Sequence, residues 1–160
     1  MNFYWSYALV RFDHVFEQVE LSFTFDPNAE PFHYEWQEYY LLDSALTADV
    51  IQQKALDRVT EIRRAIDVYL AAMEAFEAGQ HQWIEYREGL YWRYMLRRDG
   101  ITLVAEVQWA LSNDPEAEPF HGEDIPFQLD DPAMSPAVMQ AGVAAQNEVV
   151  WRGLALHTEI

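Results

Sequence analysis

One stretch of this sequence occurs twice, and this repeat limits the folds open to the chain more than any other feature. Residues 26–33 read DPNAEPFH and residues 114–121 read DPEAEPFH. The match continues without a gap at a spacing of 88 residues, and eleven of the twenty-two positions in 26–47 are identical in 114–135. Upstream, residues 4–11 and 91–98 share the pattern Y-W-x-Y-x-L-x-R. The sequence therefore predicts an internal duplication, with repeats at 1–80 and 81–160 inside a single domain that spans 1–160.

Each repeat begins with two stretches that are typical of β-strands. Residues 2–12 and 91–98 alternate and are rich in aromatic side chains, and turns at Asp13-His14 and Asp99-Gly100 lead into returning strands over 15–25 and 101–111. His is among the residues that tolerate a positive φ, so His14 is expected to replace the glycine of the second turn. On one face of the first strand, the same residue types occur in both copies. This agreement predicts that the face lies toward the core. Its residues are Trp5, Tyr7, Leu9 and Arg11 in the first copy and Trp92, Tyr94, Leu96 and Arg98 in the second.

The second half of each repeat reads as an acidic loop followed by a helix. Thr47 and Ser135 are candidate N-caps, and the apolar periodicity predicts helices over about 48–78 and 136–152, the second ending near Gly153. We expect a short helical turn over 35–42 in the first loop, whereas the proline-containing second loop should stay extended.

The expected fold is α+β, made from a β-β-loop-α unit that occurs twice. The two hairpins would form one four-stranded antiparallel sheet, with both helices packed on one face and a pseudo-two-fold axis between the halves. The opposite face would be half-polar and partly aromatic, and it is a candidate surface for a partner or a second copy. Its aromatic residues are Tyr4, Phe12, Phe16 and Tyr91.

Charge is the strongest compositional feature. The net charge is −17, and the acidic residues gather in two regions without Lys or Arg, residues 12–53 with nine and residues 99–151 with ten. Such a surface repels nucleic acid and anionic lipid and attracts basic partners. The chain has no cysteine, which excludes disulfides and thiolate metal sites. No signal peptide or membrane-length apolar run is visible, so a cytoplasmic protein is expected.

Few residues suggest catalysis. The spacing of Asp, Glu and His in each acidic stretch is D-x3-E-x2-H, which could hold a divalent metal but matches no standard metal motif. No nucleophile elbow and no glycine-rich phosphate loop is present. The chain is therefore expected to have no enzymatic activity, no cofactor and no metal. The alternative metal ligands are Asp26, Glu30, His33, Asp114, Glu118 and His121.

These features favour an acidic protein-binding module that neutralises a basic partner. Its most concrete form is an immunity or inhibitor protein that blocks the cationic site of a nuclease-type bacterial toxin. We expect a monomer with internal symmetry, with a dimer as an alternative. Two other functions stay open, an acidic secretion chaperone that acts as a dimer and a small metal-dependent hydrolase. The predicted contact residues are Asp114, Glu116, Glu118, Glu123, Asp124, Asp130 and Asp131, followed by Glu30, Glu35, Trp36 and Glu38.

Overall fold

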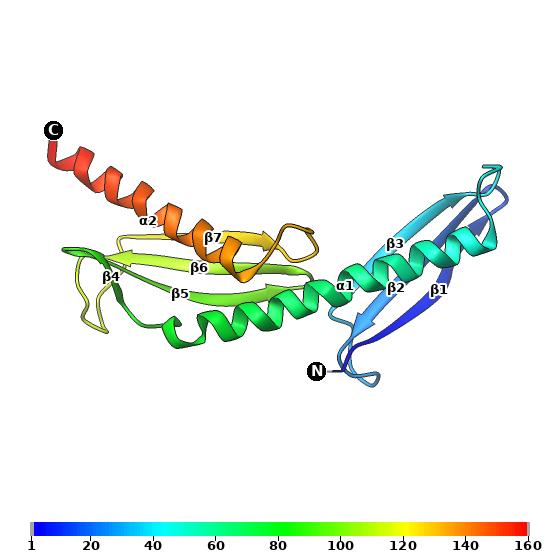
Figure 1. Ribbon diagram of the computed structural model, residues 1–160, viewed down its shortest axis with the longest axis horizontal. Helices are drawn as coiled ribbons and strands as arrows, with labels where there is room; N and C mark the ends of the chain where they lie inside the picture. The colour runs from blue at the N-terminus through cyan, green and yellow to red at the C-terminus, as the bar shows by residue number, and fades with distance from the viewer. Residues whose placement is uncertain (1, 160) are drawn as a thin grey trace. The chain divides into compact units, whose positions relative to one another are not determined.

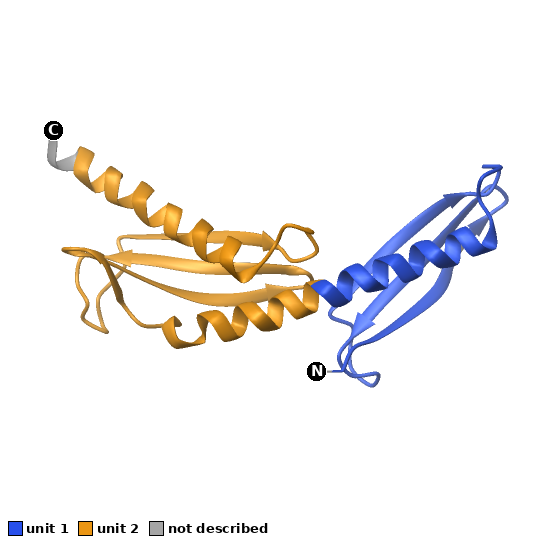
Figure 2. Cartoon of the chain, in the orientation of Figure 1, with its two compact units in different colours: residues 1–64 blue, residues 65–160 orange. Residues whose placement is uncertain are grey.

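The chain folds into two compact units. The computed structural model describes residues 2–159, without the side chains of residue 11 and of 157–159. Unit 1 comprises residues 1–64 and unit 2 comprises residues 65–160 (Figure 2). The boundary falls inside the long helix α1 (Ala48–Phe76), so one helix supplies residues to both units (Figure 1). Each unit has its own antiparallel sheet, and the fold class is α+β.

Unit 1 is a three-stranded sheet covered on one face by residues 48–64 of α1. Its strands are β1 (Tyr4–Asp13), β2 (Phe16–Thr24) and β3 (His33–Tyr40), in the order β1-β2-β3. Alternate residues of the central strand β2 point toward the helix, as the period of two requires. The buried residues are Val19, Leu21 and Phe23 from β2, Tyr39 from β3, and Ala55, Val59 and Ile62 from α1.

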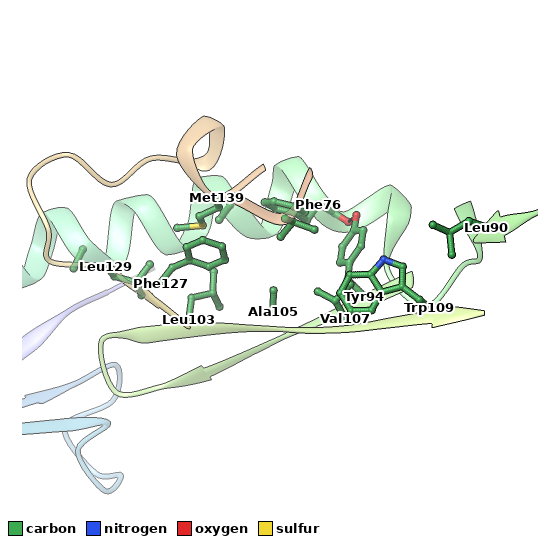
Figure 3. Close-up of a cluster of buried hydrophobic side chains, with 13 residues drawn as sticks. Phe76, Leu90, Tyr94, Leu103, Ala105, Val107, Trp109, Phe127, Leu129 and Met139 are labelled. Atoms are coloured by element: carbon green, nitrogen blue, oxygen red, sulfur yellow. Dashed lines mark hydrogen bonds between the residues drawn. The ribbon is translucent and has the colours of Figure 1, made fainter. Parts of the chain in front are cut away.

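Unit 2 is a four-stranded sheet with the order β4-β5-β6-β7. Its strands are β4 (Ile84–Arg87), β5 (Leu90–Asp99), β6 (Thr102–Ala110) and β7 (His121–Gln128). Residues 65–76 of α1, a short 3-10 turn (Glu77–Gly79) and helix α2 (Pro136–Glu159) complete it. Both helices contribute to one core (Figure 3). Its buried members are Ala65, Ala72, Phe76, Leu90, Tyr94, Leu103, Ala105, Val107, Trp109, Phe127, Leu129, Met139 and Val143.

The two matching sequence stretches form the same local structure. The backbone N–H of Phe32 donates to the carbonyl of Phe23, and that of Phe120 donates to the carbonyl of Trp109, both at 2.9 Å. At the helix starts, Thr47 Oγ1 and Ser135 Oγ each accept a hydrogen bond of 3.2 Å from the backbone N–H three residues later. The prediction of both N-caps is confirmed.

The prediction of one four-stranded sheet is wrong, because the acidic stretches are not loops throughout. Residues 33–40 form β3 instead of a helical turn, and residues 121–128 form β7. Glu residues and prolines suggested loops, but both strands are sheet edges, where a polar side chain or the missing N–H of Pro126 is tolerated. With a third strand and a helix segment against it, each hairpin completes a sheet without the other.

Several smaller expectations also change. Helix α2 runs through Gly153 to Glu159, whereas α1 ends at Phe76, close to its predicted end. Gly100 has a positive φ of 59°, but His14 is not among the described residues with positive φ. The register of β1 shifts between Leu9 and Arg11, which places Phe12 opposite Glu17 and therefore on the helix side. No helix in residues 2–159 is long and apolar enough to cross a membrane.

Candidate functional site

A hollow in the connection between β6 and β7 brings three predicted contact residues together. Two apolar side chains, Leu111 and Phe120, line the same hollow as the carboxylates. They are 62% and 46% exposed. Asp114 also shapes the loop, since its carboxylate accepts a hydrogen bond of 2.9 Å from the backbone N–H of Glu116. The hollow measures about 380 Å³ and is lined by Leu111, Ser112, Asp114, Glu116, Ala117, Glu118 and Phe120.

The equivalent connection in unit 1 is packed differently. Phe25 and Phe32 stack on each other with ring centroids 4.3 Å apart, and Phe32 also lies 6.5 Å from the ring of Phe3. Glu30 stands exposed in this connection. Because the aromatic rings are used within unit 1, fewer of them are free to meet a partner than in the hollow of unit 2.

The other predicted contact residues of unit 2 do not line the hollow. Glu123 lies opposite the buried Val107, on the helix side of β7, whereas Asp124 lies opposite Glu106 on the other side. The carboxylate of Asp131 accepts a hydrogen bond of 2.9 Å from the backbone N–H of Ala133, in the turn before α2. Asp130 is half-buried in the same turn. None of these four carboxylates lines the hollow.

The outer face of sheet 1 presents an aromatic and acidic surface. Trp36 is 63% exposed, and its Nε1 donates a 3.1 Å hydrogen bond to Glu20 on the neighbouring strand. Glu38 is exposed on the same face as Trp36, since the two residues are two positions apart on β3. Phe16 and Tyr40 pack together at one end, with ring centroids 5.3 Å apart. Aromatic anchors with neighbouring charges are typical of protein-binding surfaces.

Glu35 is bound by other side chains of unit 1 and is not open to a partner protein. It points to the helix side of β3, where its oxygens accept hydrogen bonds of 2.7 and 2.6 Å from Arg58 and lie 2.7 Å from Nε2 of His33. Burial alone would raise the pKa of Glu35, but the hydrogen bonds from His33 and Arg58 and the charge of Arg58 lower it to about 2. Glu35 is thus ionised and bound within unit 1.

The side chains proposed as metal ligands are not assembled. Each histidine pairs with the glutamate two positions later: His33 with Glu35, and His121 with Glu123 at 3.4 Å. Asp26 instead accepts a hydrogen bond from the backbone N–H of Asn28. Among the side chains that the structure describes, which exclude 157–159, no group of three or more His, Asp or Glu is placed to hold a metal ion.

Sequence reasoning missed two parts of these sites. The sequence pattern assigned Leu111 to a strand, but in the structure β6 ends at Ala110 and Leu111 follows it as an exposed residue. Arg58 lies in the helix, 23 residues after Glu35, and no local pattern joins them. No protein-family model matches this chain, and neither a curated protein nor a solved structure matches it.

Proposed function

We propose that this chain is an acidic protein-binding module that neutralises a basic partner through the hollow between β6 and β7. The observation that carries the proposal is the combination of exposed Leu111 and Phe120 with the carboxylates of Asp114, Glu116 and Glu118 around them. Apolar anchors supply most of the binding free energy at an interface, while rim charges set the association rate and the choice of partner.

The charge distribution supports a cationic partner. Residues 99–151 contain ten acidic residues and no Lys or Arg, so the hollow lies within a stretch of one sign of charge. A Lys or Arg side chain of the partner can place its aliphatic stem on Leu111 or Phe120 and its charge against the carboxylates. We propose an immunity or inhibitor protein for a nuclease-type toxin as the concrete form, because the active sites of such toxins must bind polyanions.

We also infer that the chain arose by duplication of a β-β-β-α unit. The support is the sequence match at a spacing of 88 residues, together with equivalent hydrogen bonds at both turns and both helix starts. Duplication leaves one copy free to change, and the open second loop beside the aromatic-packed first loop fits such a change. We therefore place the primary contact in unit 2.

The test compares capture of a basic protein from the native host by three forms of the chain. The first is wild type, and the second carries Leu111→Ser, Glu116→Lys and Glu118→Lys, which spares the turn-forming Asp114. The matched control carries Glu85→Lys and Glu88→Lys, two exposed acidic residues outside the acidic stretch. All three should fold alike by circular dichroism.

The expected result is a basic protein that wild type and the control retain and the hollow variant loses. The wild-type affinity should fall steeply as salt concentration rises, because surface charges are screened. Equal capture by wild type and the hollow variant would contradict the proposed site. A partner without excess positive charge would contradict the proposed mechanism.

A further inference from the structure

Strand β1 leaves an apolar surface uncovered on unit 1. It is an edge strand, and its outer edge pairs with no other strand of residues 2–159. Trp5, Tyr7 and Leu9 lie opposite the fully buried Phe23, Leu21 and Val19 and thus on the helix side of the sheet. They are nevertheless 38%, 49% and 55% exposed.

The exposure has a simple cause in the position of α1. In unit 1 the helix packs toward β2 and β3, since Lys54 lies 5.6 Å from the ring centroid of Tyr39 and Arg58 binds Glu35. The space between β1 and the helix stays open as a groove of about 380 Å³. Its lining residues are Trp5, Tyr7, Glu17, Ala48, Ile51, Gln52, Ala55 and Leu56.

Unit 2 shows what covers the equivalent surface. Tyr94 corresponds to Tyr7 in the sequence match but is only 6% exposed. Its ring contacts Phe76 edge to face with centroids 5.3 Å apart, and its hydroxyl donates a 2.7 Å hydrogen bond to the carbonyl of Phe76 (Figure 3). Strand β4 also pairs with the beginning of β5. In unit 1, α1 covers β1 only in part, and no strand of the described residues pairs with the outer edge of β1.

The chemistry of β1 indicates the occupant. A chain with a net charge of −17 can associate with itself only where its own carboxylates are sparse. Residues 2–12 contain no Asp or Glu and one Arg, whereas the other edge strands, β3, β4 and β7, each contain at least one carboxylate inside the strand. The carboxylate of β1 is confined to Asp13 at its end, so the edge strand that best matches this apolar edge is β1 itself. A two-fold axis between two copies of one edge makes an antiparallel pair in which both edges are satisfied at once.

We propose that two copies of this chain associate through β1, which forms a six-stranded antiparallel sheet across the dimer. In this arrangement Trp5, Tyr7 and Leu9 of each chain meet their counterparts on the helix side and close both grooves. The contact uses residues of unit 1 only and shares none with the hollow between β6 and β7. Each chain of the dimer keeps its own partner site.

The test is the mass of the full chain in solution, measured by light scattering and sedimentation over a range of protein concentrations. Wild type should have twice the mass of one chain. The variant Tyr7→Lys with Leu9→Lys should be monomeric, because lysines on an edge strand oppose pairing. We expect its dissociation constant to rise at least about 100-fold, as for the loss of central interface residues. Leu42→Lys with Leu156→Lys is the matched control, since both leucines are over 60% exposed outside β1, and it should stay dimeric.

A second measurement does not depend on any variant. In wild type, the amides of 4–12 that point away from β2 should exchange their hydrogens more slowly at high protein concentration than at low concentration. A wild-type monomer at all concentrations, or a dimer whose β1 amides exchange at the same rate throughout, would overturn the proposal. Both outcomes leave the hollow of unit 2 untouched, so they are separate from a failure of partner binding.

Discussion

At the scale of single residues, Glu35 and Glu123 occupy matching positions with different surroundings. Glu35 is bound by Arg58 and His33. The residue 88 positions after Arg58 is Gln146, which carries no charge. Among the described residues, the Oε2 atom of Glu123 is buried without a hydrogen-bond partner, and its other carboxylate oxygen lies 3.4 Å from Nε2 of His121. A buried carboxylate oxygen without a hydrogen-bond donor costs free energy. Glu123 should therefore contribute less to the stability of the fold than Glu35.

Exchange of each carboxylate for an amide should reveal this difference. Glu35→Gln should lower the free energy of unfolding by about 1–3 kcal/mol, because it removes the negative charge that Arg58 and His33 bind, although Arg58 keeps its ion pair with Glu61. Glu123→Gln should change it by no more than about 0.5 kcal/mol. Urea unfolding of both variants beside wild type measures the values. Equal losses in the two variants would contradict the assignment of the ion pair.

The effect of Glu35 should also depend on pH. Its pKa is about 2 in the folded chain against 4.5 for the free side chain, so folding favours the ionised form. The stabilisation is fully present above pH 4.5 and is lost as the pH falls toward 2. The stability difference between wild type and Glu35→Gln should therefore shrink across this interval. A difference that stayed constant from pH 6 to pH 2.5 would speak against the ionised pair.

A buried hydrogen bond in unit 2 gives a further residue-scale prediction. Trp109 and Asn147 are almost fully buried, and the indole Nε1 donates to Asn147 Oδ1 at 2.9 Å. Asn147→Leu leaves this N–H unpaired and should cost about 1–3 kcal/mol of stability. Gln146→Leu, at the neighbouring half-buried position, is the control and should change stability by less than about 0.5 kcal/mol. Thermal unfolding followed by tryptophan fluorescence measures both.

The sequence alone indicated which acidic residues are candidates for a site, but it did not show what each of them contacts. Acidic residues of the second loop could be singled out because they lie in a run without Lys or Arg, and the structure brings three of them to one hollow. Glu35 could not be separated from them, since its orientation depends on the pairing of β3 with β2. One residue of shift in that pairing would turn Glu35 to the outer face.

At the scale of elements, both helix starts were predicted because a cap is a local interaction. Thr47 and Ser135 need only their own side chain and a backbone N–H three residues later. The strands β3 and β7 were missed because they are stabilised by pairing with β2 and β6, which local composition does not show. The end of α2 was missed for a similar reason, since packing by Leu154 supports the helix beyond Gly153.

Two glycines provide a matched test of the elements around them. A side chain at Gly79 would collide with the hydroxyl of Tyr94, whereas Gly153 has open space within α2. Gly79→Ala should therefore displace the ring that joins α1 to β5 and destabilise the chain by about 1–3 kcal/mol. Gly153→Ala should stabilise it by about 0.5–1 kcal/mol through helix propensity. Destabilisation by both alanines, measured by urea unfolding, would contradict this account of α2.

At the scale of the whole molecule, the prediction of a single sheet was wrong because it counted only the strands of the two hairpins. Two hairpins of two strands suggest a shared four-stranded sheet, because each hairpin alone is marginal. The third strand and the helix segment of each unit remove that need, and the division between the units falls at residues 64 and 65 of α1. The internal match predicted that the halves are alike, but it carries no information on how many strands each contains.

The net charge of −17 should make the stability of the whole chain depend on salt. Repulsion among carboxylates without nearby cations opposes the compact state, and salt screens it. The melting temperature should rise by about 2–4 °C between about 20 and 300 mM NaCl, which corresponds to roughly 1 kcal/mol. The rise should become smaller in Glu30→Gln with Glu116→Gln and Glu118→Gln, because this variant has three exposed negative charges fewer. If the melting temperature instead fell with salt, ion pairs such as Arg58 with Glu35 and Arg97 with Glu106 would outweigh the repulsion.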